Sequence, residues 1–411
     1  MSDDNKPQEE KFIIRRGGAE DVKTKEQIRD FVQLILQRSV NISTLIGSGA
    51  SLDAIPLMKT TLEEYCKNKK GTDKGRRLEV IKREISRDGK DENDIELIFT
   101  RIEQKISGGT TEKEENKKLK KDLMKTFIRS IYNGYSEEKR KKHDFVLGNY
   151  VRVIHGLGRS RQILARQQRT TFDIVNLFTT NYDFFHEEAL EQSRYAYTDG
   201  FSNGLDNIFS DREFHRRPID LDDRFRDHLQ PINPYFRLVK LHGSINWEKI
   251  EKNDKEFVHR VSVDFEKSIQ ALDDSNESDT LSRVLIAPTK SKFALTQDMP
   301  YSDLFREFVN CLAVPNSILF VSGFGFGDSH ISNLIESALD RTDFTLYVFA
   351  EDPLNSDGGV AGFYKKVKSS PNAYFISPSD RGSDPLKFSD FAYFMQPSID
   401  TDSRQDLLEE R

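Results

Sequence analysis

Short apolar runs that alternate with helix-like segments constrain the fold of this 411-residue chain more than any other feature. They recur from residue 170 onward and read FDIVNLFTT, FRLVKLHG, RVLIAPT, NSILFVSGFG, FTLYVFAE and AYFIS. Their nearly continuous apolar character is typical of strands covered on both faces. Helical patterns follow several of them, as in Ile331, Leu334, Ile335, Ala338 and Leu339. The sequence therefore predicts an α/β fold with a doubly wound parallel sheet.

The interval from residue 61 to 169 has helical periodicity throughout. Two sets of residues form apolar stripes. The first consists of Ile95, Ile98, Phe99, Ile102 and Ile106. The second consists of Leu119, Leu123, Phe127, Ile128 and Ile131. Such stripes indicate helix packing rather than cofactor contacts. We predict a helical subdomain inserted into an α/β domain that comprises residues 24–60 and 170–400.

The two ends of the chain are polar, and we expect flexible tails over residues 1–23 and 401–411. A helix is predicted after the first tail, because Thr24 and Gln27 can form a capping box. Its apolar face contains Ile28, Phe31, Val32 and Ile35.

Composition excludes several classes of function. Only two cysteines occur, Cys66 and Cys311, which argues against a thiolate zinc site and favours a reducing compartment. No apolar run is long enough to cross a bilayer and no signal peptide is visible, so the sequence predicts a cytoplasmic protein without membrane contact. The net charge of −6 offers no global attraction to nucleic acid, and the basic runs are interleaved with acids.

Ligands of an open parallel sheet bind beyond the carboxyl ends of its strands. The first strand end reads Gly47-Ser48-Gly49-Ala50-Ser51 after the run NISTLI. Glycines there allow close approach to the backbone, and a following helix offers N–H groups to a dinucleotide pyrophosphate. The alternative is a tight strand-to-helix turn, since Leu52 stands where the dinucleotide fingerprint has its third glycine.

The next two strand ends carry polar side chains. Thr180, Asn181 and Asp183 follow one strand and could bind a ribose hydroxyl and an amide, although Asp183 could instead cap the next helix. His242 leaves another buried strand directly before a glycine, and a histidine in that position is often structural.

Two later strand ends complete the set. Ser322 and Gly323 open a glycine-rich stretch that ends at Asp328 and could offer a second group of backbone donors. Glu351 follows the run TLYVFA and could accept a hydrogen bond from an adenosine ribose hydroxyl.

In this order, the motifs at these strand ends resemble those of the sirtuin family. That family reads G-A-G-x-S, then T-Q-N-x-D, then a histidine-glycine strand end, then G-T-S and a late ribose-contacting loop. The resemblance covers residues 36–60 and 170–355 and implies that NAD lies against Gly47 and Gly49. It implies cofactor-binding roles for Ser48, Ser51, Thr180, Ser322, Gly323 and Glu351.

Three departures distinguish this chain from deacylating sirtuins. The interval after His242 lacks the four cysteines of the zinc module, Pro56-Leu57-Met58-Lys59 replaces the family's P-D-F-R, and the helical insert is foreign to deacylases. These traits resemble the bacterial sirtuin-like NAD hydrolases of antiphage defence. The chain extends only about 60 residues beyond Glu351, which is similar to the short members that pair with a HerA-type ATPase.

That resemblance implies catalytic roles for Asn181, which would orient water or ribose, and for His242 as general base. It implies that Asp183 anchors the nicotinamide amide and that no metal takes part. A gated homo-oligomer bound to a HerA-type ring ATPase is expected, with nucleic acid reached only through the partner complex. Two alternatives stay open: a protein deacylase or ADP-ribosyl transferase, and a non-catalytic NAD or ADP-ribose sensor.

Overall fold

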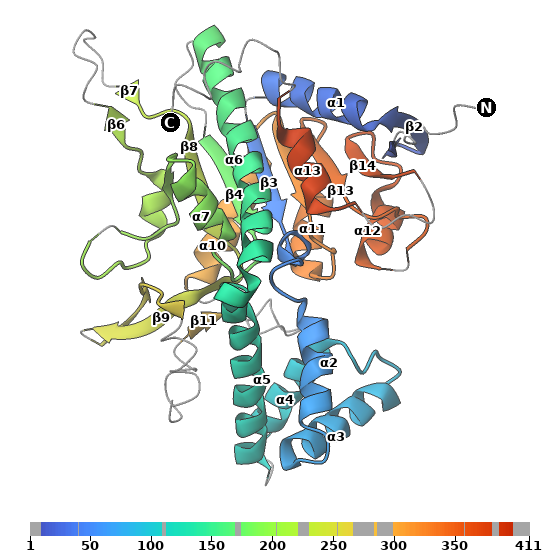
Figure 1. The fold of residues 1–411 in the computed structure, drawn as a ribbon, viewed down its shortest axis with the longest axis vertical. Coiled ribbons are helices and arrows are strands. Elements are labelled where there is room, and N and C mark those ends of the chain that lie inside the picture. The colour runs from blue at the N-terminus through green and yellow to red at the C-terminus, as the bar shows by residue number, and fades with distance from the viewer. Residues whose placement is uncertain are drawn as a thin grey trace.

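The computed structural model (Figure 1) describes residues 10–39, 41–108, 112–168, 174–202, 204–220, 230–252, 254–265, 283–285, 299–356, 358–379 and 386–397. A mixed sheet of nine strands crosses this described part of the chain in the order β2-β1-β14-β13-β12-β3-β4-β8-β5. Its strands are β1 (Lys11–Arg16), β2 (Ala19–Thr24), β3 (Asn41–Ile46), β4 (Ile174–Thr179), β5 (Ala196–Thr198), β8 (Tyr235–Lys240), β12 (Ser317–Ser322), β13 (Phe344–Phe349) and β14 (Ala373–Pro378). All pairs from β14 to β5 are parallel.

The register brings the carboxyl ends of the central strands to one level. Ile46 pairs with Thr179 on one side and with Ser322 on the other. Thr179 pairs with Lys240, and Ser322 pairs with Phe349. The motifs that follow these residues therefore begin side by side at one edge of the sheet.

Helices cover both faces of the sheet, as predicted for a doubly wound fold. One face packs against α1 (Lys25–Arg38), α6 (Arg140–Gln168), α7 (Phe185–Gln192) and α13 (Phe388–Met395). The other face packs against α10 (Tyr301–Ala313), α11 (Ser329–Ala338) and α12 (Gly359–Val367). The capping box at the start of α1 is confirmed, since the Gln27 backbone N–H donates to Thr24 Oγ1 and the Thr24 N–H donates to Gln27 Oε1.

The expectation of a flexible tail over residues 1–23 is wrong from Lys11 onward, while residues 1–9 lie outside the described part. Strand β1 pairs antiparallel with β14 and with β2. Phe12 and Ile14 are buried by this pairing, and the buried Arg15 guanidinium donates to Asp352 and to Ser377 Oγ. The charged residues on both sides of Phe12, Ile13 and Ile14 hid this short strand in the sequence.

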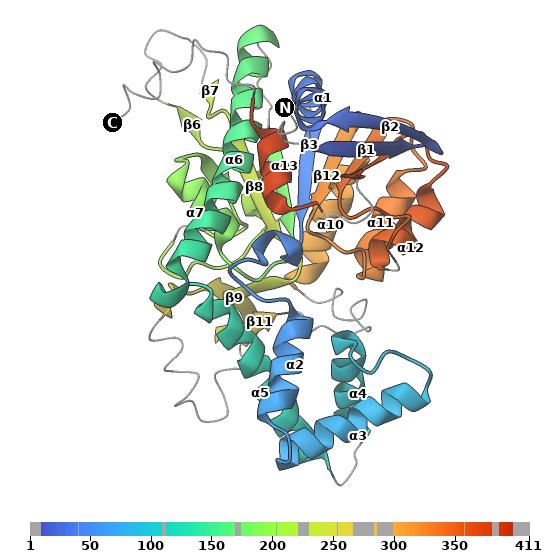
Figure 2. The ribbon, with the colours of Figure 1, turned by 45° about the vertical axis from the view of Figure 1, so that its right-hand side comes forward.

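A helical lobe with its own core lies below the sheet (Figures 1 and 2). It consists of α2 (Met58–Asn68), α3 (Asp73–Arg87), α4 (Ile95–Ser107) and α5 (Lys113–Asn133), and both apolar stripes contribute to its core. The long helix α6 was expected in this insert, yet its Val146, Tyr150 and Ile154 pack in the main core against the sheet. We refer to α2–α5 as the helical lobe and to the remainder as the sheet lobe.

Smaller elements surround the sheet. A second sheet in the described residues has the order β10-β9-β11, formed by β9 (Gly243–Lys252), β10 (Lys255–Arg260) and β11 (Arg283–Leu285). The remaining elements are β6 (Ile219–Asp220), β7 (Gln230–Pro231) and the 3₁₀ helices η1 (Ser48–Ser51), η2 (Glu137–Lys139) and η3 (Asp211–His215). The run RVLIAPT thus begins in this antiparallel sheet instead of the main one, and its last four residues lie outside the described part. Within the described residues, no helix has the length and hydropathy needed to cross a membrane.

Candidate active site

A pocket of about 290 Å³ lies at the carboxyl edge of the main sheet. We call the lining from the loops after β3, β4, β8 and β12 the polar wall, and the lining from the segment that enters α2 and from α5 the apolar wall. The lining residues are Ser48, Ser51, Ile55, Pro56, Leu57, Met58, Phe127, Ser130, Ile131, Thr180, Asn181, Tyr182, Asp183, His242, Gly323, Phe324, Gly325, Gly327 and Asp328. The pocket therefore lies between the two lobes.

The glycines after β3 face another loop of the protein. A Cβ on Gly47 would lie 2.4 Å from the carbonyl oxygen of Gly323, and one on Gly49 would lie 3.0 Å from Gly323 Cα. Gly323 itself has φ +65°, and a Cβ there would lie 2.5 Å from the Ala50 nitrogen. Side chains are thus excluded by two backbones in contact. Gly47 and Gly49 are not among the lining residues, whereas Ser48, Ser51 and Gly323 are.

The loop after β12 alternates glycines with phenylalanines, and its two phenylalanines differ, since Phe324 lines the pocket and Phe326 does not. Gly325 and Gly327 line the pocket with their backbones. Phe326 turns into the protein, where its ring stacks on Phe363 with centroids 4.3 Å apart. The buried ring anchors the loop, so that small residues face the pocket in a fixed position.

Asn181 is buried at the centre of the polar wall. Its Nδ2 donates to the Gly47 carbonyl oxygen at 3.1 Å, and it also lies within hydrogen-bonding distance of Ser51 Oγ and Tyr150 OH, both at 3.3 Å. The carbonyl can only accept, so it fixes which end of the amide is the nitrogen. Within the described residues, the buried Oδ1 makes no hydrogen bond.

His242 is held by a carboxylate from a distant strand end. Its Nε2 lies 3.0 Å from Asp328 Oδ2, and both side chains are buried. The other carboxylate oxygen, Oδ1, accepts from the backbone N–H groups of His330 and Ile331 and so caps α11. Asp328 therefore connects the histidine to the first turn of a helix.

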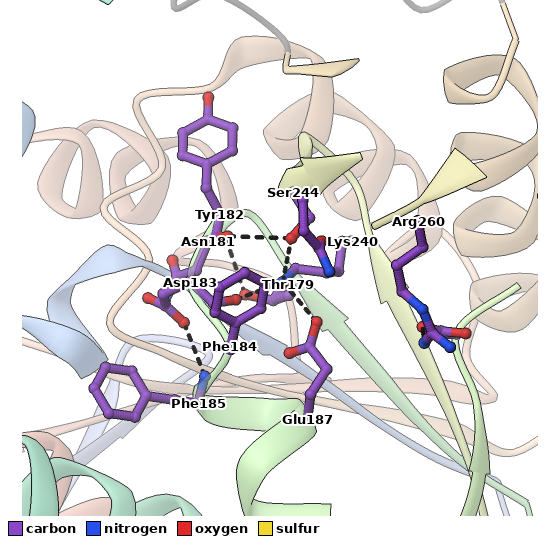
Figure 3. Close-up of polar contacts among 12 residues, drawn as sticks. Thr179, Asn181, Tyr182, Asp183, Phe184, Phe185, Glu187, Lys240, Ser244 and Arg260 are labelled. Atoms are coloured by element: carbon purple, nitrogen blue, oxygen red, sulfur yellow. Dashed lines mark hydrogen bonds and ion pairs between the residues drawn. The ribbon is translucent and has the colours of Figure 1, made fainter. Parts of the chain in front are cut away.

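Asp183 lies beside Asn181, and burial raises its pKa to about 6 against the opposing effect of Lys240. The expected helix cap is weak, because Oδ1 accepts from the Phe185 N–H at the long distance of 3.4 Å and no side-chain cap hydrogen bond is found at the start of α7 in the described residues. Figure 3 shows the carboxyl directed toward that N–H. An acid with a pKa near 6 is divided between its protonated and ionised forms near neutral pH.

Lys240 holds the backbone at Asp183 in position. Its fully buried ammonium group donates to the Asp183 carbonyl oxygen, to Glu187 Oε1 at 2.8 Å and to Ser244 Oγ at 3.0 Å (Figure 3). Three charge-assisted or polar contacts satisfy a cation that would otherwise be costly to bury.

Besides Gly47 and Gly49, two more of the predicted residues lie outside the pocket lining. Ser322 is buried at the end of β12, where its carbonyl oxygen accepts from the Gly47 N–H at 3.0 Å. Glu351 follows β13 and accepts from Ser356 Oγ at 2.6 Å. The structure brings Ser48, Ser51, Thr180, Asn181, Asp183, His242 and Gly323 together around the pocket.

Three residues of the site were missed in the sequence. Tyr150 is a helix residue in an apolar stripe, and Lys240 stands inside a strand, so neither shows a local signal. Asp328 did show a local signal, because a carboxylate directly after a glycine-rich loop can contact a site residue as well as cap the following helix. In the described part of the chain, no group of three or more His, Cys, Asp or Glu side chains could hold a metal ion.

Comparison with known proteins adds one relationship. The chain matches no curated protein. A family model described as the SIR2-like domain matches residues 175–369, a span that runs from β4 to the end of α12 and leaves out β3 with its glycines. This segment, which carries Asn181, His242 and Asp328, is therefore similar to the SIR2-like domains of the sirtuin-like family, which bind NAD.

Proposed function

We propose that this protein hydrolyses NAD to nicotinamide and ADP-ribose. The observation that carries the proposal is Asn181, whose amide nitrogen is fixed by the Gly47 carbonyl while its buried Oδ1 makes no hydrogen bond in the described structure. A buried acceptor without a partner costs free energy. A ribose hydroxyl or a water molecule at the anomeric carbon would satisfy it.

The pocket has the composition that the two halves of the substrate require. Small residues at Ser48, Gly323 and Gly325 leave backbone groups near the polar wall, as phosphates need. The apolar wall includes Phe127 and Ile131, which suit a pyridine ring and exclude water from it.

The reacting groups differ in what they contribute. Cleavage of the glycosidic bond passes through a cation-like ribose, so the site has to hold that ribose and position one water molecule. Asn181 would orient the water and His242 would accept its proton. Asp183, with a pKa of about 6, would bind the nicotinamide amide.

Chromatography of nucleotides after incubation with NAD tests the proposal. We expect nicotinamide and ADP-ribose from the unmodified protein, and a loss of about 10²–10⁴-fold in Asn181→Ala and in His242→Ala. Asn176→Ala is the matched control. Asn176 is also buried, within β4, and its Oδ1 accepts a hydrogen bond from Arg237 Nε away from the pocket. The control should lose about 1–3 kcal/mol of stability but keep its turnover. Wild-type turnover in Asn181→Ala would remove the assigned role.

The same experiment separates the other classes of function. Formation of O-acyl-ADP-ribose, or transfer of labelled ADP-ribose to protein, would indicate a deacylase or a transferase. Calorimetric binding of NAD without nicotinamide release would indicate a sensor.

We extend the proposal to regulation, on the resemblance to short antiphage NAD hydrolases. Unregulated hydrolysis would deplete the host's own NAD, so a homo-oligomer that becomes active on a HerA-type ring ATPase would protect the cell until infection. The helical lobe, with many exposed charges on α3 and α5, is the proposed contact surface. Equal NAD hydrolysis with and without the ATPase would contradict this regulation.

A further inference from the structure

His242 and Asp328 come from strand ends that are not neighbours. Strands β8 and β12 are separated by β4 and β3 in the sheet. Asp328 spans this distance because the preceding loop, anchored by Phe326, passes along the pocket. The contact between Nε2 and Oδ2 is 3.0 Å, with side-chain exposures of 8% for the histidine and 5% for the aspartate.

A helix cap alone does not explain Asp328. One oxygen, Oδ1, accepts from both the His330 and Ile331 N–H groups. A serine would supply such an oxygen with similar capping strength and without a buried charge. Burying the second oxygen, Oδ2, costs free energy unless a hydrogen bond offsets it. His242 Nε2 provides such a hydrogen bond.

Resting on the proposed function, we propose that Asp328 is a positioning residue that keeps a proton on Nε2 of His242 and stabilises the ring after it takes a second proton. The capping bonds prevent the carboxylate from rotating, so the orientation of the ring is fixed as well. A carboxylate–histidine pair of this kind selects the tautomer that can act as a base.

In this step water is the nucleophile and nicotinamide is the leaving group. The attacking water gives a proton to the other ring nitrogen of His242, and its oxygen forms a bond to the anomeric carbon. The glycosidic bond breaks, and its electron pair stays on the nicotinamide nitrogen, which becomes neutral. The protonated ring, facing Asp328, then returns its proton to solvent.

The substitution Asp328→Asn gives a sharp test. Its amide oxygen is needed at the cap, where two N–H groups point, so its NH₂ group has to face Nε2. A donor there forces the histidine proton onto the opposite nitrogen. Because asparagine caps helices as well as aspartate does, the fold should be unaffected. Asp328→Ser keeps the cap and removes the carboxylate oxygen that contacts the ring.

Two measurements on the full-length variants decide the proposal. With ¹⁵N-labelled histidine, and His242→Gln to assign the signal, NMR should show Nε2–H in the unmodified protein and the other tautomer in Asp328→Asn. Steady-state kinetics should show kcat lower by about 10²–10⁴-fold in Asp328→Asn, a smaller loss in Asp328→Ser, and nearly constant KM for NAD.

The role of Asp328 and the proposed hydrolase activity can fail independently in these measurements. An unchanged tautomer, or a changed tautomer with wild-type kcat, would overturn the role of Asp328. A protein that releases no nicotinamide but shows the tautomer change would retain the carboxylate–histidine pairing and lose the proposed hydrolase activity. Thermal unfolding that is equal in all variants confirms that the helix cap has been preserved.

Discussion

At the scale of single residues, the polar side chains of the pocket are held by parts of the chain that are far apart in sequence. Tyr150 OH lies 3.0 Å from Ser51 Oγ and 3.3 Å from Asn181 Nδ2. Helix α6 thereby joins the loop after β3 to the loop after β4. Each such bond contributes little to stability, yet together with the Gly47 carbonyl these hydroxyls hold the Asn181 amide in place.

We expect Tyr150→Phe to lower the rate of nicotinamide release by about 10-fold or more while costing only about 0.5–1.5 kcal/mol of stability. The matched control is Tyr65→Phe, which removes a hydrogen bond of 2.8 Å to Asp122 inside the helical lobe. Turnover assays and urea denaturation measure both effects. Equal kinetic losses in the two variants would show that the Tyr150 hydroxyl has no particular link to the site.

Asp183 makes stability depend on pH. Burial raises the pKa of its carboxyl from an ordinary 3.8 to about 6, so the folded protein keeps this proton where the unfolded chain has lost it. The stability due to this proton is present at low pH and is lost as pH rises from about 4 through about 6. The loss is on the order of 3 kcal/mol, at about 1.4 kcal/mol for each pKa unit.

Asp183→Asn removes this titration and leaves the other carboxyl groups unchanged. The stability of the variant relative to the unmodified protein should therefore rise between pH 4 and pH 7 by on the order of 3 kcal/mol. Urea denaturation of both proteins at four pH values measures the difference. A difference that stays constant with pH would mean that folding does not shift the pKa of the Asp183 carboxyl.

At the scale of elements, the loops after β3 and β12 act as one unit because their backbones are in contact. A methyl group on Gly47 would lie 2.4 Å from the Gly323 oxygen and 2.6 Å from Phe324 Cα. Neither contact involves the flexible end of a side chain. The two loops therefore have to separate if either acquires a side chain.

Gly47→Ala should cost about 1–3 kcal/mol of stability and should also reduce turnover, because it displaces the loop that carries Asp328. The control is Gly148→Ala in the middle of α6, where no described atom beyond its own helix lies within 4 Å of the added methyl. That variant should gain about 0.5–1 kcal/mol. Thermal unfolding and turnover of the two variants test the prediction, which fails if Gly47→Ala behaves as Gly148→Ala does.

Which elements could be predicted from the sequence depends on how their burial is encoded. The central strands β3, β4, β8, β12, β13 and β14 are apolar on both faces, and the runs identify each of them. Strand β2 reads AEDVKT and is mostly exposed, so its composition gave no signal. The boundary at α6 was also hidden, because an apolar stripe does not specify which of two cores it enters.

The site could be predicted where residues directly follow strands. Asn181, Asp183 and His242 line one pocket because the register aligns their strand ends, and a sequence pattern can indicate that alignment. In the sequence, Gly47 was explained by the approach of a ligand, whereas the contact that excludes a side chain there is with Gly323. Contacts between two loops depend on tertiary structure and leave no pattern in either segment.

At the scale of the whole molecule, the described residues form two lobes with separate cores. The core of the helical lobe includes the buried residues Leu78, Ile98, Phe99 and Leu119. It is smaller than the two cores that flank the sheet. A small separate core is expected to open at a lower free energy than the central strands do.

Hydrogen exchange should therefore show weaker protection in α2–α5 than in β3, β4 and β12. We expect Ile98→Ala to reduce protection by about 2–5 kcal/mol in the helical lobe alone, because Ile98 is fully buried there. The matched change Ile42→Ala, in the central strand β3, should lower protection in the sheet lobe. Uniform loss of protection across both lobes in Ile98→Ala would show that they unfold as one unit.

One chain passage between the lobes lines the pocket, and the other packs against the first. The passage into α2 contributes Ile55 and Leu57 to its wall, and the one leaving α5 contains Gly134, where an added Cβ would touch Ile55. A molecule bound there would contact both lobes, and we therefore expect its binding to depend on the angle between them. A force applied to the far end of the helical lobe would then change the affinity of the pocket for that molecule.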